Sequence, residues 1–585
     1  MSTPLEQTEH QYYHQHHIEN PLQHIDHDQN EHYNKNETLP TTKYIDKLLD
    51  DCYNKKMPIT NNPTQFLHLY RIKYYTIYVS LGLANASDAS EILCLSYMLS
   101  NPDFQNEILD NDMVHYGSYA AGSVFFGMLL GGIVVGSLGD NLGGRKSVLL
   151  FGLILNAFFG ILASFSNNIY IFILCRWMAG IGIGGSIPPL FTLSAELAPT
   201  SKRGLYVTIV ASFWMIGSIF ISLLALIMFE YWECSWRLFM GVAALPSLLG
   251  AITIYCFVPE SHKFYLWMHQ YEGAVHSTKV LLHAMNSSLY PSIHAIHDRE
   301  LQVLQQKDRR HTQTVLSYTN ILGQSLQNVM RLYHSPFLYT STISLQIIWL
   351  CLSFGTYGLL TWINTIFVSI HLQNVYFNSF LFALANLPGN ILSAFLLDRI
   401  GRHNLLLFSM VSASLSLVIF AYQVHQNTLD GVTTVSSSSS IIIVLSACTF
   451  QALSISAWNT IDCMSTEMFP TSIRSTGLAL CAATGRIGAM LAQFINGMMM
   501  QSNHDTFLLI VSSLMLLIGA VIPKLLLYMH YNALKRHKGI DSNGTAEVDM
   551  SGKALLEDED IVSSLPRAQS YSSVGQVIET STLIS

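Results

Sequence analysis

The sequence predicts an all-α integral membrane protein built from two similar six-helix bundles. Half of the 585 residues are hydrophobic, only 12% are charged, and the mean hydropathy is +0.33, which is far from the values of a soluble domain. The stretch E-L-A-P-T-S-K-R that begins at Glu196 recurs about 270 residues later as E-M-F-P-T-S-I-R from Glu467. A parallel internal repeat of this kind is typical of two helical halves that flank a shared central path.

Apolar runs of about 20 residues, the length that crosses a bilayer, identify the individual helices. About twelve are expected, at residues 74–99, 114–138, 147–166, 168–194, 205–229, 237–258, 338–363, 376–397, 404–422, 440–465, 474–499 and 506–530. They form an N-terminal bundle over residues 71–258 and a C-terminal bundle over residues 338–530. A linker loop over residues 259–337 joins the two bundles.

The loop charges predict the orientation of the chain in the membrane. Lys and Arg gather in the loops after helices 2, 4, 8 and 10 and in the linker, whereas the opposite loops carry acidic residues such as Asp103 and Glu107. The positive-inside rule then places the linker and both termini in the cytoplasm. The membrane itself stays open between the plasma membrane and an endomembrane vesicle.

The two ends of the chain, residues 1–70 and 531–585, predict disordered cytoplasmic tails because they are polar and poor in large apolar residues. The N-terminal tail is rich in His, which could bind a metal. Because the His spacing is irregular and no Cys or carboxylate set completes a site, a solvated tail is the preferred interpretation, and no metal or cofactor is expected. Nothing in the composition suggests a nucleic-acid partner, and we expect a monomer in a lipid bilayer.

Several motifs together resemble those of the major facilitator superfamily. They are G-x-x-x-D-x-x-G from Gly136, R-x-x-x-G-x-G-x-G from Arg176, P-E-S from Pro259 and D-R-x-G-R from Asp398. Within that superfamily, D-x-x-E at Asp88, L-P-G-N from Leu387 and A-W-N-x-x-D from Ala457 resemble the synaptic vesicle glycoprotein 2 and related-protein branch, which is similar to organic ion transporters. The likeness spans roughly residues 70–530 and implies the major facilitator fold.

The resemblance implies a role for the repeated motifs at the cytoplasmic ends of the helices. In the superfamily they form charge networks between the halves that latch the outward-facing state. The positions carried over are Asp140 with Arg145, Glu196 with Arg203, and the group of Asp398, Arg402, Glu467 and Arg474. The alternative is that these charges only anchor and cap the helices on the positive side.

The charges that do not repeat point to a substrate or coupling site. An ionisable side chain at mid-membrane costs about 2.5–3.5 kcal/mol, so it predicts a function. Glu91 in helix 1 and Arg176 in helix 4 each lie roughly 12 Å below the outer surface, and Asp88 shares a helix face with Glu91. Asp88, Glu91 and Arg176 are therefore the leading site. The alternative is a buried structural ion pair.

Further candidates lie on the C-terminal helices. Arg486 is expected near the midplane and Asp462 in the cytoplasmic half of helix 10. Tyr357, Trp458 and Asn459 add aromatic faces and an amide suited to a ring or an organic cation. Packing against lipid or other helices is the alternative for each aromatic residue.

These observations predict a secondary transporter that moves a small charged organic solute by alternating access, with or without proton coupling as a symporter. A carboxylate beside an Arg suits either an anion or a cation, so the charge of the solute is left open. The alternatives are a sugar carrier, or a non-transporting receptor or trafficking protein with the same fold. No nucleophile, metal or phosphate-loop motif suggests an enzyme.

Overall fold

The structure, a computed structural model, describes residues 45–46, 49–50, 64–109, 113–138, 144–268, 270–285, 329–334, 336–429, 437–469, 473–501 and 505–537. The predicted latch residue Asp140, the His-rich part of the N-terminal tail, the middle of the linker and the C-terminal tail after residue 537 lie outside these ranges. The boundaries predicted for bundles, linker and tails stay predictions.

The N-terminal half contains six membrane-length segments, some of which are interrupted. In chain order they are α3 (Thr64–Leu99), η1 with α5 (Met113–Gly117 and Ser118–Leu138), α6 (Arg145–Ser164), α7 (Ile169–Leu197), α8 with η4 (Arg203–Ala225 and Leu226–Tyr231), and α9 with α10 (Trp236–Ala243 and Leu245–Phe257). The short α4 (Pro102–Glu107) follows α3, and the single turn η3 (Thr200–Lys202) leads into α8. The break between α9 and α10 falls just before Pro246, which cannot donate a helical hydrogen bond.

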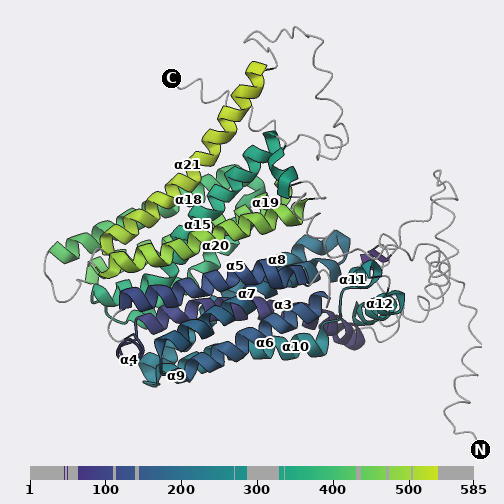
Figure 1. Cartoon of the computed structure of the whole chain (residues 1–585), viewed down its shortest axis with the longest axis horizontal. Coiled ribbons are helices and arrows are strands. Elements are labelled where there is room, and N and C mark those ends of the chain that lie inside the picture. Colours follow the sequence, from purple (N-terminus) through teal and green to yellow (C-terminus); the bar gives the residue numbers. More distant parts are fainter. Residues whose placement is uncertain are drawn as a thin grey trace, which may run out of the picture.

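The C-terminal half repeats this plan. Its segments are α15 (Pro336–Ser369), α16 with α17 (Val375–Leu384 and Asn386–Ile400), α18 (Arg402–Leu429), α19 (Ser437–Met468), α20 (Arg474–Gln501) and α21 (Asp505–His537). Two further helices, α11 (His262–Trp267) and α12 (Tyr271–Met285), lie in the linker beside one end of the bundle. Figure 1 shows the two halves as adjacent layers, with α11 and α12 at the end opposite α4.

Eleven helices of the described part are long and apolar enough to cross a membrane, where the sequence predicted about twelve. The remaining predicted span is α3, which is 36 residues long and packs against α8 and α10 inside the bundle. We attribute its lower hydropathy to the polar run Asn85–Glu91, all of which is buried. The helix is therefore a member of the bundle that composition alone does not identify.

Helix packing repeats between the two halves. In the N-terminal half, α7 packs against α5 and α6, and α3 packs against α8 and α10; in the C-terminal half, α19 packs against α17 and α18, and α15 packs against α20 and α21. The duplication predicted from the short repeat thus extends to the arrangement of the helices, and with the absence of strands from the described part it gives an all-α membrane fold of two related bundles.

Close helix approach in the N-terminal half depends on the glycines of α7. A side chain at Gly184 would collide with the backbone carbonyl of Met128 in α5, and one at Gly182 would collide with that of Gly152 in α6. Small residues allow such backbone contact between membrane helices. This holds α7, and with it Arg176, firmly between two neighbours.

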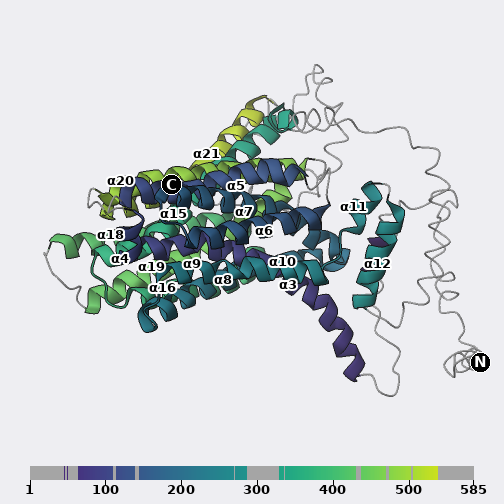
Figure 2. The ribbon, with the colours of Figure 1, turned by 60° about the horizontal axis from the view of Figure 1, so that its bottom comes forward.

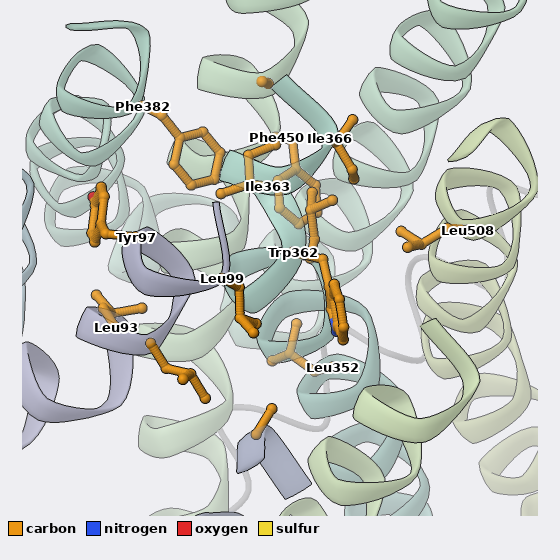
Figure 3. Close-up of a cluster of buried hydrophobic side chains, with 14 of the residues drawn as sticks. Leu93, Tyr97, Leu99, Leu352, Trp362, Ile363, Ile366, Phe382, Phe450 and Leu508 are labelled. Carbon is orange, nitrogen blue, oxygen red and sulfur yellow. The ribbon is translucent and has the colours of Figure 1, made fainter. Parts of the chain in front are cut away.

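We call the end that carries α11 and α12 the linker end, and the opposite end the far end. The two halves meet through α5 with α20, α3 with α15, and α8 with α16. At the far end, Asn364 Nδ2 of α15 donates to Ser96 Oγ of α3 (3.0 Å), and Tyr119 of α5 packs on Phe494 of α20. Figure 3 shows Leu93, Tyr97 and Leu99 of α3 beside the buried core side chains of the C-terminal half. The far end is therefore sealed by polar and apolar contacts.

At the linker end, part of the stretch predicted as a polar tail is folded. The helix α3 starts at Thr64, and its first turns project from the bundle in Figure 2. Ile45 and Leu49 also lie inside the stretch predicted as a disordered tail, yet both are buried in a core cluster with Leu197, Tyr206 and Leu281. The physical reason is that these two side chains, although isolated in a polar stretch, find an apolar surface made by α7, α8 and α12.

Candidate functional site

The predicted pair of Glu91 and Arg176 comes together inside the N-terminal half. The Arg176 Nη1 atom contacts Glu91 Oε1, and Nη2 donates to the Glu91 backbone carbonyl (2.8 Å). Cys94 Sγ lies 3.6 Å from Nη1. Both charged side chains are only 1% exposed. The arrangement fits the predicted alternative of a buried structural ion pair, because the guanidinium is held on one turn of α3.

Asp88 lies one turn earlier on α3 and, unlike Glu91, forms no direct ion pair among the described residues, although Glu91 Oε2 and Arg176 Nε are also buried without a hydrogen-bond partner there. Asp88 Oδ2 accepts a hydrogen bond from Ser186 Oγ of α7 (3.2 Å), whereas its Oδ1 is buried without a hydrogen-bond partner among the described residues. A buried carboxylate without a directly bonded cation is costly when it is charged. Asp88 is thus the member of the predicted cluster that is best suited to hold a proton.

The C-terminal candidates surround Arg486. This guanidinium lies over the ring of Tyr357, 5.6 Å from its centroid, and the Tyr357 ring packs 5.7 Å from that of Trp458. Arg486, Tyr357 and Trp458 are partly exposed, and Asp462 is exposed, although all four lie on membrane-length helices. Partly exposed aromatic and charged groups of this kind could contact a solute directly.

Arg486 also connects the two halves electrostatically. The positive charge of its guanidinium acts electrostatically on the carboxylates of Asp462 on α19 and Asp88 on α3, without a direct ion pair to either. Tyr357, which Arg486 covers, in turn contacts Phe125 of α5 and Trp214 of α8. The unduplicated charges predicted separately in the two halves therefore belong to one central group.

Asn459 is part of a cluster of amide and hydroxyl side chains next to the central charged group. Its Nδ2 donates to Asn390 Oδ1 (2.6 Å) and to Ser393 Oγ (2.7 Å), both on α17. Asn390 also lies 3.7 Å from the sulfur of Met215 in the other half. The side chains of Asn390 and Asn459 are partly exposed, so they could bind hydroxyl groups.

In the N-terminal half, the latch residues pair differently from the prediction. Arg145, at the start of α6, forms an ion pair with Glu196, at the end of α7 (2.9 Å), and Ser261 Oγ also donates to Glu196. Arg203 instead donates to the Ala195 carbonyl (2.9 Å) and lies 4.0 Å from Asp46. The predicted pairing of Glu196 with Arg203 is replaced because helix packing brings the start of α6 beside the end of α7.

In the C-terminal half, Arg402 at the start of α18 pairs with Glu467 near the end of α19 (3.1 Å). Arg474 Nε lies 3.4 Å from the Phe469 carbonyl, and the side chain of Asp398 is outside the described residues. The pairs Arg145–Glu196 and Arg402–Glu467 occupy equivalent places in the repeat. Each of these ion pairs lies within one half. The charge networks between the halves that the resemblance implies stay a prediction for another state of the protein.

The structure shows further residues for which the sequence analysis predicted no role. Glu260, from the P-E-S motif, accepts the backbone N–H groups of Arg145 (3.0 Å) and Lys146 and so caps α6. Burial raises the pKa of Glu260, against the effect of these hydrogen bonds. Ser186, Asn364 and Asn390 are uncharged polar residues in largely apolar helices, and of these only Asn390, in the L-P-G-N motif, carried a signal in the sequence.

Comparisons with known proteins agree with this architecture. The model of the family described as "Sugar (and other) transporter" matches residues 85–528. Human synaptic vesicle glycoprotein 2C is 24% identical, with 77% of this chain and 78% of the relative covered, and rat synaptic vesicle glycoprotein 2A is 24% identical, with 71% and 72% covered. These relatives confirm the predicted resemblance to the synaptic vesicle glycoprotein 2 branch.

Solved structures show the same fold. The partially occluded, inward-open conformation of the E. coli xylose transporter XylE matches with a TM-score of 0.59 at 16% identity and covers 76% of this chain and 96% of its own. The proton:xylose symporter XylE bound to 6-bromo-6-deoxy-D-glucose matches with a TM-score of 0.56 at 17% identity, covering 78% and 95%. At such identity the likeness shows the fold alone, and it confirms the predicted major facilitator fold.

Proposed function

We propose that this chain, which belongs to the sugar (and other) transporter family, is a secondary carrier of a small charged organic solute. It works by alternating access, with the solute bound between the two halves. The observation that carries the proposal is Arg486, a charge absent from the other half of the repeat, which interacts with a carboxylate on each half. A group of this kind can bind differently in the two states of a carrier, as coupling requires.

Asp88 is the proton site in this proposal. It is buried, its Oδ1 has no hydrogen-bond partner among the described residues, and its cation Arg486 sits on the opposite half. When the halves move apart, Asp88 loses that cation and takes up a proton more readily. Glu91 and Arg176 support α3 and α7 and do not contact the solute, because both are buried.

The charges favour a cation as the solute. When Asp88 is deprotonated, the central group has three carboxylates, Asp88, Glu91 and Asp462, against two guanidinium groups, Arg176 and Arg486. The excess negative charge and the partly exposed rings of Tyr357 and Trp458 suit a positively charged organic group. Such a solute and a proton would compete for the same carboxylates, which couples their movements.

A sugar is the second candidate. The partly exposed amides of Asn390 and Asn459 offer donors and acceptors for hydroxyl groups next to the charged centre. The solute screen must therefore contain monosaccharides as well as organic cations and anions.

Uptake into proteoliposomes, with and without an inward proton gradient, tests the proposal. Wild type is compared with Asp88→Asn and Arg486→Gln, and with Asp103→Asn as a matched control, because Asp103 is exposed near the far end. We expect gradient-driven uptake of an organic cation by wild type and the control, loss of the gradient effect in Asp88→Asn, and weak uptake by Arg486→Gln.

The other outcomes are equally informative. Uptake of a monosaccharide alone would favour the sugar carrier. If the folded protein takes up none of the solutes tested, a receptor or trafficking role in a vesicle or plasma membrane becomes the better proposal.

A further inference from the structure

Residues 45–46 and 49–50 pack against the linker end of the N-terminal half. Ile45 and Leu49 are buried, at 1% and 0% exposure, in a cluster that also contains Leu281 of α12 and Tyr206 of α8. These residues therefore join the linker helices to the loop between α7 and α8, which is part of the duplicated motif. We call residues 45–46 and 49–50 the clasp.

Two carboxylates fix the clasp, Asp50 to that loop and Asp46 to α11. Asp50 Oδ1 accepts hydrogen bonds from the backbone N–H of Ser201 (3.1 Å) and from Ser201 Oγ (3.0 Å), and Asp50 Oδ2 accepts one from Thr200 Oγ1. Asp46 Oδ2 forms an ion pair with Lys263 Nζ of α11 (2.9 Å). The apolar contacts hold one face of the clasp, and the carboxylates determine where it sits.

A negative charge added to Ser201 would turn the attraction between Ser201 and Asp50 into repulsion. Ser201 and Thr200 are exposed, and Lys202 and Arg203 follow them directly in the chain. A phosphate on Ser201 would carry about −1.5 to −2 charges close to the Asp50 carboxylate, and it would replace a hydroxyl donor by acceptor oxygens. Asp50 would then lose a hydrogen bond and face a like charge.

We propose that Ser201 is a phosphorylation site that releases the clasp from the N-terminal half. A protein kinase that prefers basic residues transfers the γ-phosphoryl group of ATP to Ser201 Oγ, with ADP as the leaving group and the hydroxyl proton passing to the base of the kinase. Release of the clasp frees α12 and the loop that ends in Arg203, next to the ion pair of Arg145 with Glu196.

Hydrogen exchange of the clasp in the purified full-length chain tests this proposal without depending on transport. Ser201→Glu should make exchange in a peptide covering residues 45–50 about tenfold faster, a change equivalent to about 1.4 kcal/mol. Ser201→Ala is the matched control and should stay within about threefold of wild type, because the backbone N–H of residue 201 and Thr200 Oγ1 still donate to Asp50. Exchange in α6 and α18 reports whether each variant is folded.

A charge swap separates a specific contact from general loosening. Asp50→Lys combined with Ser201→Glu should restore slow exchange, since the new side chains attract each other. Unchanged exchange in Ser201→Glu, or failure of the swap to restore protection, would overturn the docking contact. Incubation with a basophilic kinase and ATP should place phosphate on Ser201, and phosphate found only at other residues would overturn the assignment of the site.

Discussion

Individual side chains divide the predicted site into a buried part and a partly exposed part. Glu91 and Arg176 form an ion pair inside the N-terminal half, whereas Arg486 is partly exposed and Asp462 is exposed on the C-terminal half. Both sets were predicted from the same argument, that charge in a membrane is costly. The cost of a charge is offset by the ion pair for Glu91 and Arg176, whereas Arg486 and Asp462 are not fully buried.

Removal of one charge from the buried pair of Glu91 and Arg176 should therefore lower the stability of the protein more than removal of both charges. We expect Arg176→Gln to lower stability by about 3–5 kcal/mol, because it leaves Glu91 buried and unpaired. The double variant Arg176→Gln with Glu91→Gln should recover a large part of that loss. Thermal unfolding of the purified proteins in one detergent measures both effects, and a double variant less stable than Arg176→Gln would contradict the structural role.

His262 at the linker end predicts a pH dependence of stability. Its ring is buried, neither nitrogen has a hydrogen-bond partner among the described residues, and burial, with Lys263 nearby, lowers its pKa from 6.5 to about 4. Between these values the unfolded chain binds a proton that the folded chain does not. Stability should therefore fall as the pH drops from about 6.5 to 4, by up to about 1.4 kcal/mol per unit.

The variant His262→Leu isolates this contribution. It keeps an apolar contact and has no group that titrates, so its melting temperature should match wild type at pH 7.5 and exceed it at pH 5. Equal losses of stability in both proteins on acidification would show that other groups dominate.

The helices were the most predictable part of the molecule. Apolar runs of bilayer length are a direct signal, and the predicted run at 474–499 corresponds to α20 at Arg474–Gln501. The helix α15 runs from Pro336 to Ser369, beyond the predicted 338–363, because after Asn364 and Thr365 the chain is apolar again and packs in the core. Side-chain partners were less predictable, since the pair of Arg145 with Glu196 and the docking of Asp46 depend on packing between distant segments.

Close packing of α7 against α5 gives a prediction for the glycines of α7. Gly184→Ala should cost about 1–3 kcal/mol, because a methyl group would meet the Met128 carbonyl and force the helices apart. Gly204→Ala in α8 is a matched control: no atom lies within 4 Å of the added carbon, and Ala favours the helix. Thermal unfolding should separate the two variants, and equal effects would argue against close packing as the reason for Gly184.

The complete bundle is a pair of similar halves with dissimilar centres. The ion pairs Arg145–Glu196 and Arg402–Glu467 repeat, as does the order in which the helices pack, but Arg486 and the pair of Glu91 with Arg176 do not. A duplicated scaffold can rock about its centre, while unduplicated charges give each half a separate role in binding. This division agrees with the proposed carrier, in which the halves move and the central charges respond.

Contacts at the far end should set the balance between the two states of such a carrier. Asn364 is buried, donates to Ser96 across the halves, and accepts a hydrogen bond from Ser379 of its own half. Asn364→Ala should weaken the far-end seal by about 1 kcal/mol, a roughly fivefold shift towards a state open at that end. A reporter cysteine placed at the buried far-end Ser118 should then react about fivefold faster with a maleimide, as measured by site-resolved mass spectrometry.

Two comparisons make this last prediction specific. Asn404→Ala, which alters an exposed asparagine at the linker end, should leave the reporter unchanged. The partly exposed Cys463, beside Glu467 at the linker end, should react more slowly in Asn364→Ala if opening of one end closes the other. Faster reaction at both positions would indicate loosening of the bundle, and no change at either would mean that the contact of Asn364 with Ser96 does not control the seal.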